Sequence, residues 1–285
     1  SIIKKIKEFM FKNYLEKKLY MIGTSHFLKV KNNYKNIKKI SDTEFKIYSQ
    51  NGEDGILDYL IYSLEIERPK FIEIGIGDYS ESNTRFIFER TSPKGMVVDC
   101  IKDLETKIKK RIKVWKGDLK IVNKEINSKN VLQIINDNDM MKNLDLLSID
   151  IDGIDYWVLD KFPKFFSKIA VLEYNPTFGY DLEVTIPNIP SFDRTKYHYS
   201  NLCFGMSFKA ALNLMDKKGF YFVGSNFLKN NAFFVSKKYK KNSYFKNLKI
   251  DKSQSNIESN FRESRDRNKK LNYQSGAHKI KEIIN

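Results

Sequence analysis

Short apolar segments alternate with helical segments through most of this chain, and no other feature of the sequence constrains the fold as strongly. We predict strands at 71–74, 96–99, 112–115, 144–151 and 169–174. Helices are predicted between them because apolar residues recur there at helical spacing, as in the segment 54–64. Strands that alternate with helices are typical of a doubly wound, mostly parallel α/β sheet, so we expect a Rossmann-like fold.

The last part of the pattern departs from this alternation. A helix is predicted at 207–218, and two apolar runs follow it at 220–223 and 232–235. The segment between the two runs contains glycine and asparagine, which favour turns. We therefore expect an antiparallel strand pair at the C-terminal end of the sheet.

Positive charge is concentrated at both ends of the sequence. The formal net charge is +16 over 285 residues. Residues 1–40 contain eleven Lys and two Glu (+9), and residues 236–285 contain fourteen Lys plus Arg against five Asp plus Glu (+9), which leaves −2 for residues 41–235. We therefore divide the chain into three parts: a basic helical extension with a linker (1–45), a central α/β domain (46–240) and a basic polar extension (241–285).

The basic extensions suggest contact with an anionic surface. Ile2, Ile6, Phe9 and Met10 recur at helical spacing among lysines, and such a helix binds a membrane surface, its own domain or a partner subunit. No apolar run approaches the roughly 20 residues that a membrane-spanning helix needs. The two cysteines are far apart and lack metal-type spacing. We expect a cytoplasmic protein, with peripheral membrane contact and oligomer formation both left open.

A predicted strand that leads into a Gly-x-Gly turn gives the first candidate binding site. The segment 71–78 reads FIEIGIGD, and Ser80 stands where a dinucleotide-binding fingerprint has its third glycine. The two glycines let the backbone approach a ligand closely. An acid before the turn disfavours a diphosphate and favours an aminoacyl nucleoside with a positive amine. Glu73, Gly75 and Gly77 are therefore candidate ligand-binding residues.

Two more acids extend this site. Asp99 ends the next predicted strand, 22 residues after Gly77, and an acid at that position accepts hydrogen bonds from ribose hydroxyls in dinucleotide-binding folds. Asp118 follows the third predicted strand and is a candidate contact for an adenine ring, although Gly117-Asp118 is also an ordinary turn sequence.

The segment 144–155, which reads LDLLSIDIDGID, resembles the FkbM-type class of methyltransferases. That family typically shows L-D-x-x-x-I-D-x-E-G-x-E after its fourth strand, and here Asp152 and Asp155 replace the two glutamates. The segments 48–55 (YSQNGEDG) and 231–235 (NAFFV) are also similar to related sequences. The resemblance covers roughly residues 46 to 240, which makes the central α/β domain the expected methyltransferase domain.

The resemblance implies a class I methyltransferase fold, S-adenosylmethionine as the methyl donor, and usually transfer to oxygen. With that donor, the five candidate ligand-binding residues become donor-binding residues: Glu73, Gly75, Gly77, Asp99 and Asp118. Members of the family often act on sugars, surface polysaccharides or natural products. We therefore expect an O-methyltransferase for a sugar, a surface glycan or a related small acceptor, with a place in polysaccharide biosynthesis.

Oxygen-bearing side chains follow two neighbouring predicted strands. Asp150, Glu173 and Asn175 would lie near one another at adjacent strand ends, and acid and amide oxygens are the ligands that Mg²⁺ prefers. The set is similar to the metal triad of catechol O-methyltransferase-like enzymes, except that Tyr174 separates the acid from the asparagine. The alternative is that these acids orient the acceptor and nearby helix amides without a metal.

A base is needed where an acceptor hydroxyl must lose its proton, and three residues are candidates for catalysis. His198 lies in the long polar loop 175–205, and long loops often carry function. Histidine takes up protons near neutral pH, although a lone loop histidine is also often simply exposed. Asp152 is the other candidate base, and a cation near Asp150 would lower the pKa of the hydroxyl.

Three other functions fit parts of the sequence. The basic flanks suggest an RNA or DNA methyltransferase, but the segment 173–177 (EYNPT) contains only the Asn-Pro part of the D/N-P-P-Y/F/W-type motif, so we expect no nucleic acid partner. A nicotinamide-dependent dehydrogenase would need the missing third glycine. A module that binds the donor without turnover would keep the fold and lose the chemistry.

Overall fold

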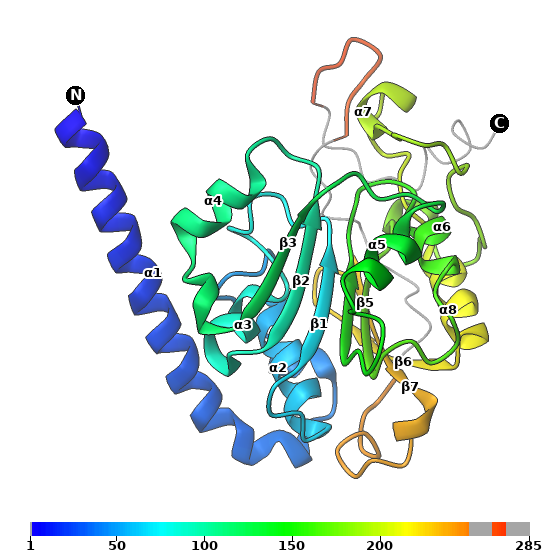
Figure 1. The fold of residues 1–285 in the computed structure, drawn as a ribbon. Helices are drawn as coiled ribbons and strands as arrows, with labels where there is room; N and C mark the ends of the chain where they lie inside the picture. Colours follow the sequence, from blue (N-terminus) through cyan, green and yellow to red (C-terminus); the bar gives the residue numbers. More distant parts are fainter. Residues whose placement is uncertain (1, 251–263, 272–285) are drawn as a thin grey trace.

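A seven-stranded sheet forms the centre of the protein (Figure 1). The structure is a computed structural model that describes residues 2–250 and 264–271. The strands in chain order are β1 (Lys70–Ile74), β2 (Lys94–Asp99), β3 (Asp118–Asn123), β4 (Leu146–Ile149), β5 (Ile169–Glu173), β6 (Phe220–Ser225) and β7 (Asn231–Ser236). Their order across the sheet is β3-β2-β1-β4-β5-β7-β6.

The direction of the strands identifies the fold. Strands β1 to β5 pair in parallel, whereas β7 is antiparallel to both β5 and β6. A parallel sheet in which the last strand of the chain is inserted antiparallel beside β5 is the arrangement of class I methyltransferases. The predicted fold class, including the C-terminal antiparallel pair, is therefore confirmed.

Helices cover both faces of this sheet. The described α-helices are α1 (Ile2–Val30), α2 (Glu53–Ser63), α3 (Arg85–Thr91), α4 (Leu104–Arg111), α5 (Val131–Asp137), α6 (Asp155–Asp160), α7 (Arg194–Tyr197) and α8 (Phe208–Lys217). Short 3₁₀ helices occur at η1 (Lys31–Asn36), η2 (Ile40–Thr43), η3 (Val114–Lys116), η4 (Pro176–Phe178) and η5 (Lys237–Tyr239).

Alternation of side chains along the strands produces two hydrophobic cores. Successive residues of a strand point to opposite faces. In β1, Ile72 and Ile74 belong to the core formed with α5, α6 and α8, whereas Phe71 belongs to the core formed with α2, α3 and α4. Because apolar residues fill both faces, the central strands read as continuous apolar runs in the sequence.

The structure corrects one predicted strand. The segment 112–115 leads into η3 instead, and the third strand is β3, six residues later. Strand β3 lies at the sheet edge and its residues are only partly buried, so Lys120 and the polar ends interrupt the apolar run that would have marked it. Helix α4, before it, buries only Leu104 and Ile108, which is too few for a clear helical pattern.

The N-terminal segment is a long helix whose second half joins the domain. Phe27 near the end of α1, Tyr34 in η1 and Ile40 in η2 are all buried in the core that contains α2. The extension 1–45 was expected to contain a linker, but its residues Tyr34 and Ile40 pack in the core of the domain. Among the described residues, no helix is long and apolar enough to cross a membrane.

The boundaries of the three predicted parts stay predictions. The C-terminal part, 241–285, is described only at 241–250 and 264–271, and its remaining residues lie outside the described part of the chain. At 241–250 the chain packs near α2, where the backbone oxygen of Tyr244 accepts a hydrogen bond from the Tyr59 hydroxyl at 3.0 Å.

Burial of α1 against the domain can be tested with two neighbouring residues. Phe27 is 8% exposed and lies under the Arg90 guanidinium at 4.2 Å, whereas Leu28 is 51% exposed. We expect Phe27→Ala to lower the free energy of unfolding by about 3–5 kcal/mol, because it leaves a cavity. Leu28→Ala should change it by no more than about 0.5 kcal/mol. Urea unfolding measures both, and equal effects would contradict the packing described.

Candidate functional site

A pocket of about 880 Å³ opens where the central strands end. Its walls come from the carboxyl ends of β1, β2 and β4 and from the segment 191–195. Sites for small ligands typically enclose roughly 300–1,000 Å³. In open α/β sheets they lie at the carboxyl ends of the strands, at the point where the strand order reverses direction. Here that point lies between β1 and β4.

The Gly-x-Gly turn after β1 forms the floor of this pocket. Gly75 has a φ of 83°, and a Cβ atom on it would lie 1.6 Å from the backbone oxygen of Asp150. Gly77 has a φ of 53° and nothing within 4 Å of its Cβ position, so it borders open space. Asp99 accepts hydrogen bonds from the backbone N–H groups of Ile76 at 3.0 Å, Gly77 at 2.8 Å and Ile101 at 3.1 Å. A carboxylate has about four lone-pair sites, so Asp99 keeps capacity for about one more hydrogen bond, at its Oδ1.

Glu73 lines the pocket, but its carboxylate oxygens accept hydrogen bonds from other residues of the protein. Its carboxylate accepts hydrogen bonds from the Ser82 hydroxyl at 2.6 Å, from the backbone N–H groups of Asn83 and Thr84, and from the Thr84 hydroxyl. Burial raises its pKa, and these hydrogen bonds oppose the rise. Glu73 therefore holds the loop that follows the turn, a role that the sequence pattern did not indicate.

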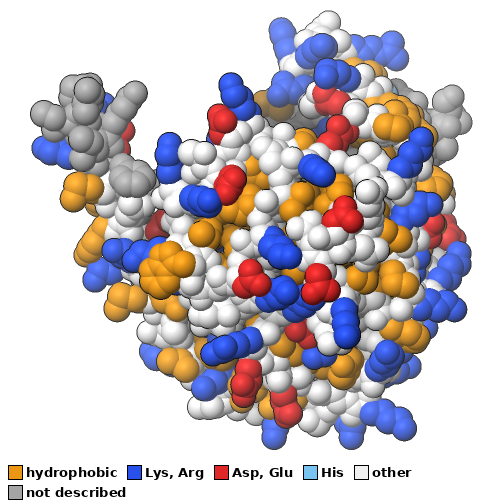
Figure 2. Space-filling model, in the orientation of Figure 1, with side chains coloured by type: hydrophobic (Ala, Val, Ile, Leu, Met, Phe, Trp, Pro, Cys, Tyr) orange, Lys and Arg blue, Asp and Glu red, His pale blue; other side chains and the backbone are white. Residues whose placement is uncertain are grey.

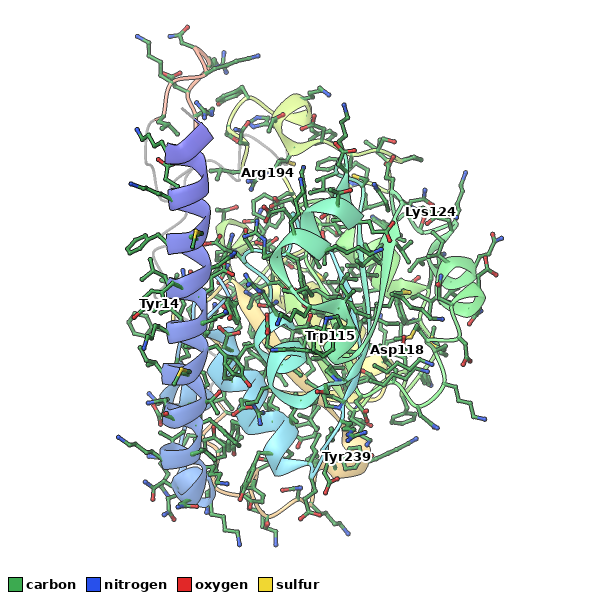
Figure 3. The ribbon with its side chains drawn as sticks, turned by 60° about the vertical axis from the view of Figure 1, so that its left-hand side comes forward. Tyr14, Trp115, Asp118, Lys124, Arg194 and Tyr239 are labelled. Carbon is green, nitrogen blue, oxygen red and sulfur yellow. The ribbon has the colours of Figure 1, made fainter. Side chains whose placement is uncertain are left out.

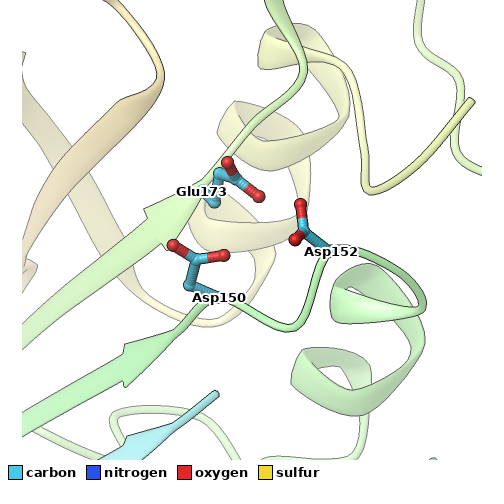
Figure 4. A group of neighbouring side chains, drawn as sticks. All are labelled: Asp150, Asp152 and Glu173. Atoms are coloured by element: carbon cyan, nitrogen blue, oxygen red, sulfur yellow. The ribbon is translucent and has the colours of Figure 1, made fainter. Parts of the chain in front are cut away.

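Three carboxylates converge beside the turn (Figure 4). One oxygen each of Asp150, Asp152 and Glu173 lies within 4.8 Å of the others. Burial, together with the Asp152 and Asp155 charges, raises the pKa of Asp150 well above its usual range. Burial and the Asp150 charge do the same to the pKa of Glu173. Such crowding is relieved by a proton or by a cation, and three carboxylate oxygens suit a hard divalent ion.

The turn that carries Asp152 is held in place from both sides. Asp152 has a φ of 52°, an uncommon backbone conformation for a residue other than glycine. The Asp155 carboxylate accepts hydrogen bonds from the N–H groups of Ile151 and Gly153, each at 2.9 Å. Arg194 in α7 approaches Asp152 from the other side, with 3.1 Å between its Nη1 and the Asp152 Oδ1. The segment 191–195 thus closes one wall of the pocket.

Asn175 does not belong to this cluster, which corrects the predicted metal set. Its side-chain oxygen accepts a hydrogen bond from the Thr177 N–H at 3.0 Å and another from the Thr177 hydroxyl. Its side-chain nitrogen donates to the backbone oxygens of Leu202 at 2.8 Å and Phe204 at 3.0 Å. Asn175 is fully buried and joins two loop segments, so Asp152 takes its place beside Asp150 and Glu173.

Two other candidates lie outside the pocket lining. Asp118 begins β3, paired with Lys94 at the amino end of the sheet, whereas Lys124, just after β3, lines the pocket (Figure 3). The predicted adenine contact is therefore wrong, because the third strand starts, and does not end, at Asp118. His198 shares a 2.7 Å hydrogen bond with the Ser200 hydroxyl, and Arg194 from the same loop reaches the pocket instead.

Some pocket residues were not singled out in the sequence. Gln50 lines the pocket from the segment 48–55, whose Glu53 accepts a 2.9 Å hydrogen bond from the side chain of Asn231 at the start of β7. Asn83 lines it after β1 and donates to the Ser148 hydroxyl at 3.1 Å. The polar run 80–84 after the Gly-x-Gly turn was the signal that could have indicated Asn83.

Negative charge dominates the pocket lining. Eight acidic residues line it against two basic ones, Lys124 and Arg194. The acidic set is Glu73, Asp78, Glu81, Asp99, Glu125, Asp150, Asp152 and Asp193. A cleft lined by one sign of charge attracts ligands of the opposite sign, so this pocket favours a cationic ligand and disfavours a phosphate-rich one.

Comparisons with known proteins add little to this picture. No protein-family model matches the chain, and no curated protein matches it. A solved structure, that of the pyocyanin biosynthetic protein PhzM, matches with a TM-score of 0.35 and 16% sequence identity over 61% of this chain and 52% of that chain. The chain thus spans about half the length of that protein, and a TM-score of this size supports no argument about activity. Membership of the FkbM-type class stays a prediction.

The role of Glu73 can be separated from ligand binding by measuring stability without a ligand. Glu73→Gln turns one acceptor oxygen into a donor that faces Ser82, Asn83 and Thr84. We expect it to lower the free energy of unfolding by about 1–3 kcal/mol, because buried donors lose their acceptor. Glu81→Gln is the matched control, since Glu81 also lines the pocket but is exposed. It should cost no more than about 0.5 kcal/mol in the same urea titration. Equal stability of the two variants would show that Glu73 is not a support of this loop.

Proposed function

We propose that this protein binds S-adenosylmethionine in the acidic pocket and transfers its methyl group to a hydroxyl of a sugar, a glycan or a related small acceptor. The observation that carries the proposal is the excess of carboxylates around a pocket at the switch point of a class I methyltransferase sheet. S-adenosylmethionine has a positive sulfonium and a positive amine, which such a lining attracts.

The donor site is proposed to lie over the Gly-x-Gly turn. Gly77 offers open space next to the backbone, and Asp99 stands at the end of the neighbouring strand β2 with capacity for about one hydrogen bond from a ribose hydroxyl. Asn83 and Gln50 add uncharged polar groups to the same pocket. Glu73 supports the site indirectly, through the loop that carries Asn83.

The acceptor is proposed to lie beside Asp150, Asp152 and Glu173. Bound donor would supply a methyl group on a good leaving group, so the chain's own contribution is alignment, exclusion of water and removal of a proton. Asp152 is the exposed member of the cluster, with Arg194 beside it, and we assign to it the role of taking the hydroxyl proton. A Mg²⁺ ion held by the three carboxylates would lower the pKa of a hydroxyl bound to it.

The rival functions differ in what the pocket must accept. A nucleic acid substrate would bring phosphates towards a lining with eight acids and two basic residues, which is unfavourable. A donor-binding module without turnover would share the donor site and differ only at the strand-end carboxylates. The two experiments below therefore address donor binding and the carboxylate cluster separately.

Donor binding is tested by calorimetry with S-adenosylmethionine and its demethylated product. We expect the wild type to bind both, and Asp99→Asn to weaken binding by about 10- to 150-fold, since a hydrogen bond to a charged group contributes about 1.5–3 kcal/mol. Asp118→Asn is the control at the opposite end of the sheet and should stay within about twofold of the wild type. If the wild type bound neither compound, the proposal that this pocket binds S-adenosylmethionine would be contradicted.

The carboxylate cluster is tested with Mn²⁺, whose binding is visible by electron paramagnetic resonance. We expect Asp152→Asn to weaken Mn²⁺ binding by about tenfold or more, because one of three charged ligands is lost. Glu81→Gln, which also lines the pocket but lies outside the cluster, should leave it unchanged. With labelled donor and a panel of glycans, Asp152→Asn should also abolish transfer while donor affinity stays within about tenfold. Absence of Mn²⁺ binding in the wild type would exclude the cation, and full transfer by Asp152→Asn would exclude this cluster from the chemistry.

A further inference from the structure

Helix α1 presents apolar side chains to solvent on the side that faces away from the domain. Met10, Phe11, Tyr14, Met21 and Ile22 are each more than half exposed, from 56% to 66%. At 100° per residue, these five positions fall within about one third of the helix circumference. Figure 3 shows Tyr14 directed away from the domain, and Figure 2 shows hydrophobic side chains along the part of α1 that stands clear of it.

The opposite side of α1 binds the domain. Gly23 and Phe27 are buried there, and the Tyr20 ring lies 6.3 Å from that of Phe86. The carboxylate of Glu16 forms an ion pair with Arg85 at 2.8 Å. The domain therefore fixes the rotation of the helix, so the outward direction of the apolar side chains is set by the packing.

The exposed apolar surface of the described protein is concentrated on this helix. Sixteen large hydrophobic residues are exposed among the described residues, and eight of them belong to α1. The eight are Met10, Phe11, Tyr14, Leu15, Leu19, Met21, Ile22 and Leu28. Single exposed hydrophobic residues are normal on a soluble surface, but a contiguous set marks an interaction site.

Lysines share the outward side with these residues. Lys4, Lys7, Lys18 and Lys29 are exposed at positions that fall on the same side of the helical wheel. Helix α1 contains two acids. Glu16 is partly buried and points to the domain, whereas Glu8 is exposed and lies beside the apolar face. Lysines at an apolar face extend their alkyl chains along it and keep their ammonium groups in the polar layer, so this combination fits the headgroup region of an anionic membrane.

We propose that the outer face of α1, defined by Met10, Phe11, Tyr14, Lys18, Met21 and Ile22, binds the surface of a membrane that contains anionic lipids. The helix cannot cross that membrane, because no described helix is long and apolar enough. Two copies of this face would bring two sets of lysines together, and like charges across an interface disfavour self-association. At an anionic lipid surface, the apolar side chains insert among the acyl chains and the lysines contact the negative headgroups.

Flotation with vesicles tests the proposal directly. The full chain should bind vesicles of phosphatidylcholine with phosphatidylglycerol and bind pure phosphatidylcholine vesicles far less. Phe11→Ser combined with Met21→Ser should lower the affinity by about tenfold or more, because two apolar side chains no longer insert. Lys18→Glu should lower it by about fivefold or more, since each lysine near such a surface contributes about 1 kcal/mol.

The controls use exposed residues of the same types elsewhere on the protein. Phe227 is 75% exposed in the loop between β6 and β7, and Lys129 is exposed before α5, so Phe227→Ser and Lys129→Glu should bind vesicles like the wild type. Circular dichroism checks that all variants are folded.

Equal loss of vesicle binding in the control variants, or no binding of the wild type to the anionic vesicles, would overturn the proposal. So would a concentration-dependent dimer, seen by sedimentation, that Phe11→Ser with Met21→Ser abolishes. Calorimetry with the donor is independent of these outcomes, so a failure here is distinguishable from a failure of the proposed function.

Discussion

The close contact between the ends of β1 and β4 is the constraint on which the rest of the site depends. A Cβ atom on Gly75 would lie 1.6 Å from the Asp150 backbone oxygen, so no other residue fits without moving one strand end. The contact brings the Gly-x-Gly turn that borders the pocket next to the strand end that carries the acidic cluster. The proposed donor and acceptor regions are therefore adjacent because two backbones touch, and the side chains at each end complete the pocket.

Backbone hydrogen bonding decides which acidic and amide side chains remain available to a ligand. Glu73, Asp155 and Asn175 all stand at strand or helix ends near the pocket, and each is held by backbone or hydroxyl partners. Asp54 is a fourth case, because its carboxylate accepts from the N–H groups of Ile47, Tyr48 and Ser49 within 2.9 Å. Such groups shape the loops around the pocket and hold its lining in place.

The sequence predicted the elements whose pattern is strong and missed those whose pattern is weak. Buried strands such as β1 and β5 appear as apolar runs, and their predicted limits differ from the observed ones by one residue. The edge strand β3 was misplaced because it is half-exposed, and that error moved Asp118 to the wrong end of the sheet. Asn175 could not be judged from spacing, because its side chain donates to the backbone oxygens of Leu202 and Phe204, far along the chain. The place of His198 outside the pocket depends on how the loop 175–205 folds, which spacing does not show. The convergence of Asp150 and Glu173 was predicted because adjacent parallel strands end at the same edge.

The ion pair of Glu16 also joins α1 to the pocket. Arg85, its partner, donates to the backbone oxygen of Ser80 at 3.2 Å, and Arg111, 3.9 Å from Glu16, pairs with Asp78 at 2.6 Å. Ser80 and Asp78 both line the pocket. A ligand that changed the position of α1 would therefore act on a loop that also lines the pocket. Such an effect would be reciprocal by thermodynamic linkage. If binding of α1 to a membrane surface changed the affinity of the pocket for its ligand by some factor, that ligand would change the affinity of α1 for the membrane by the same factor.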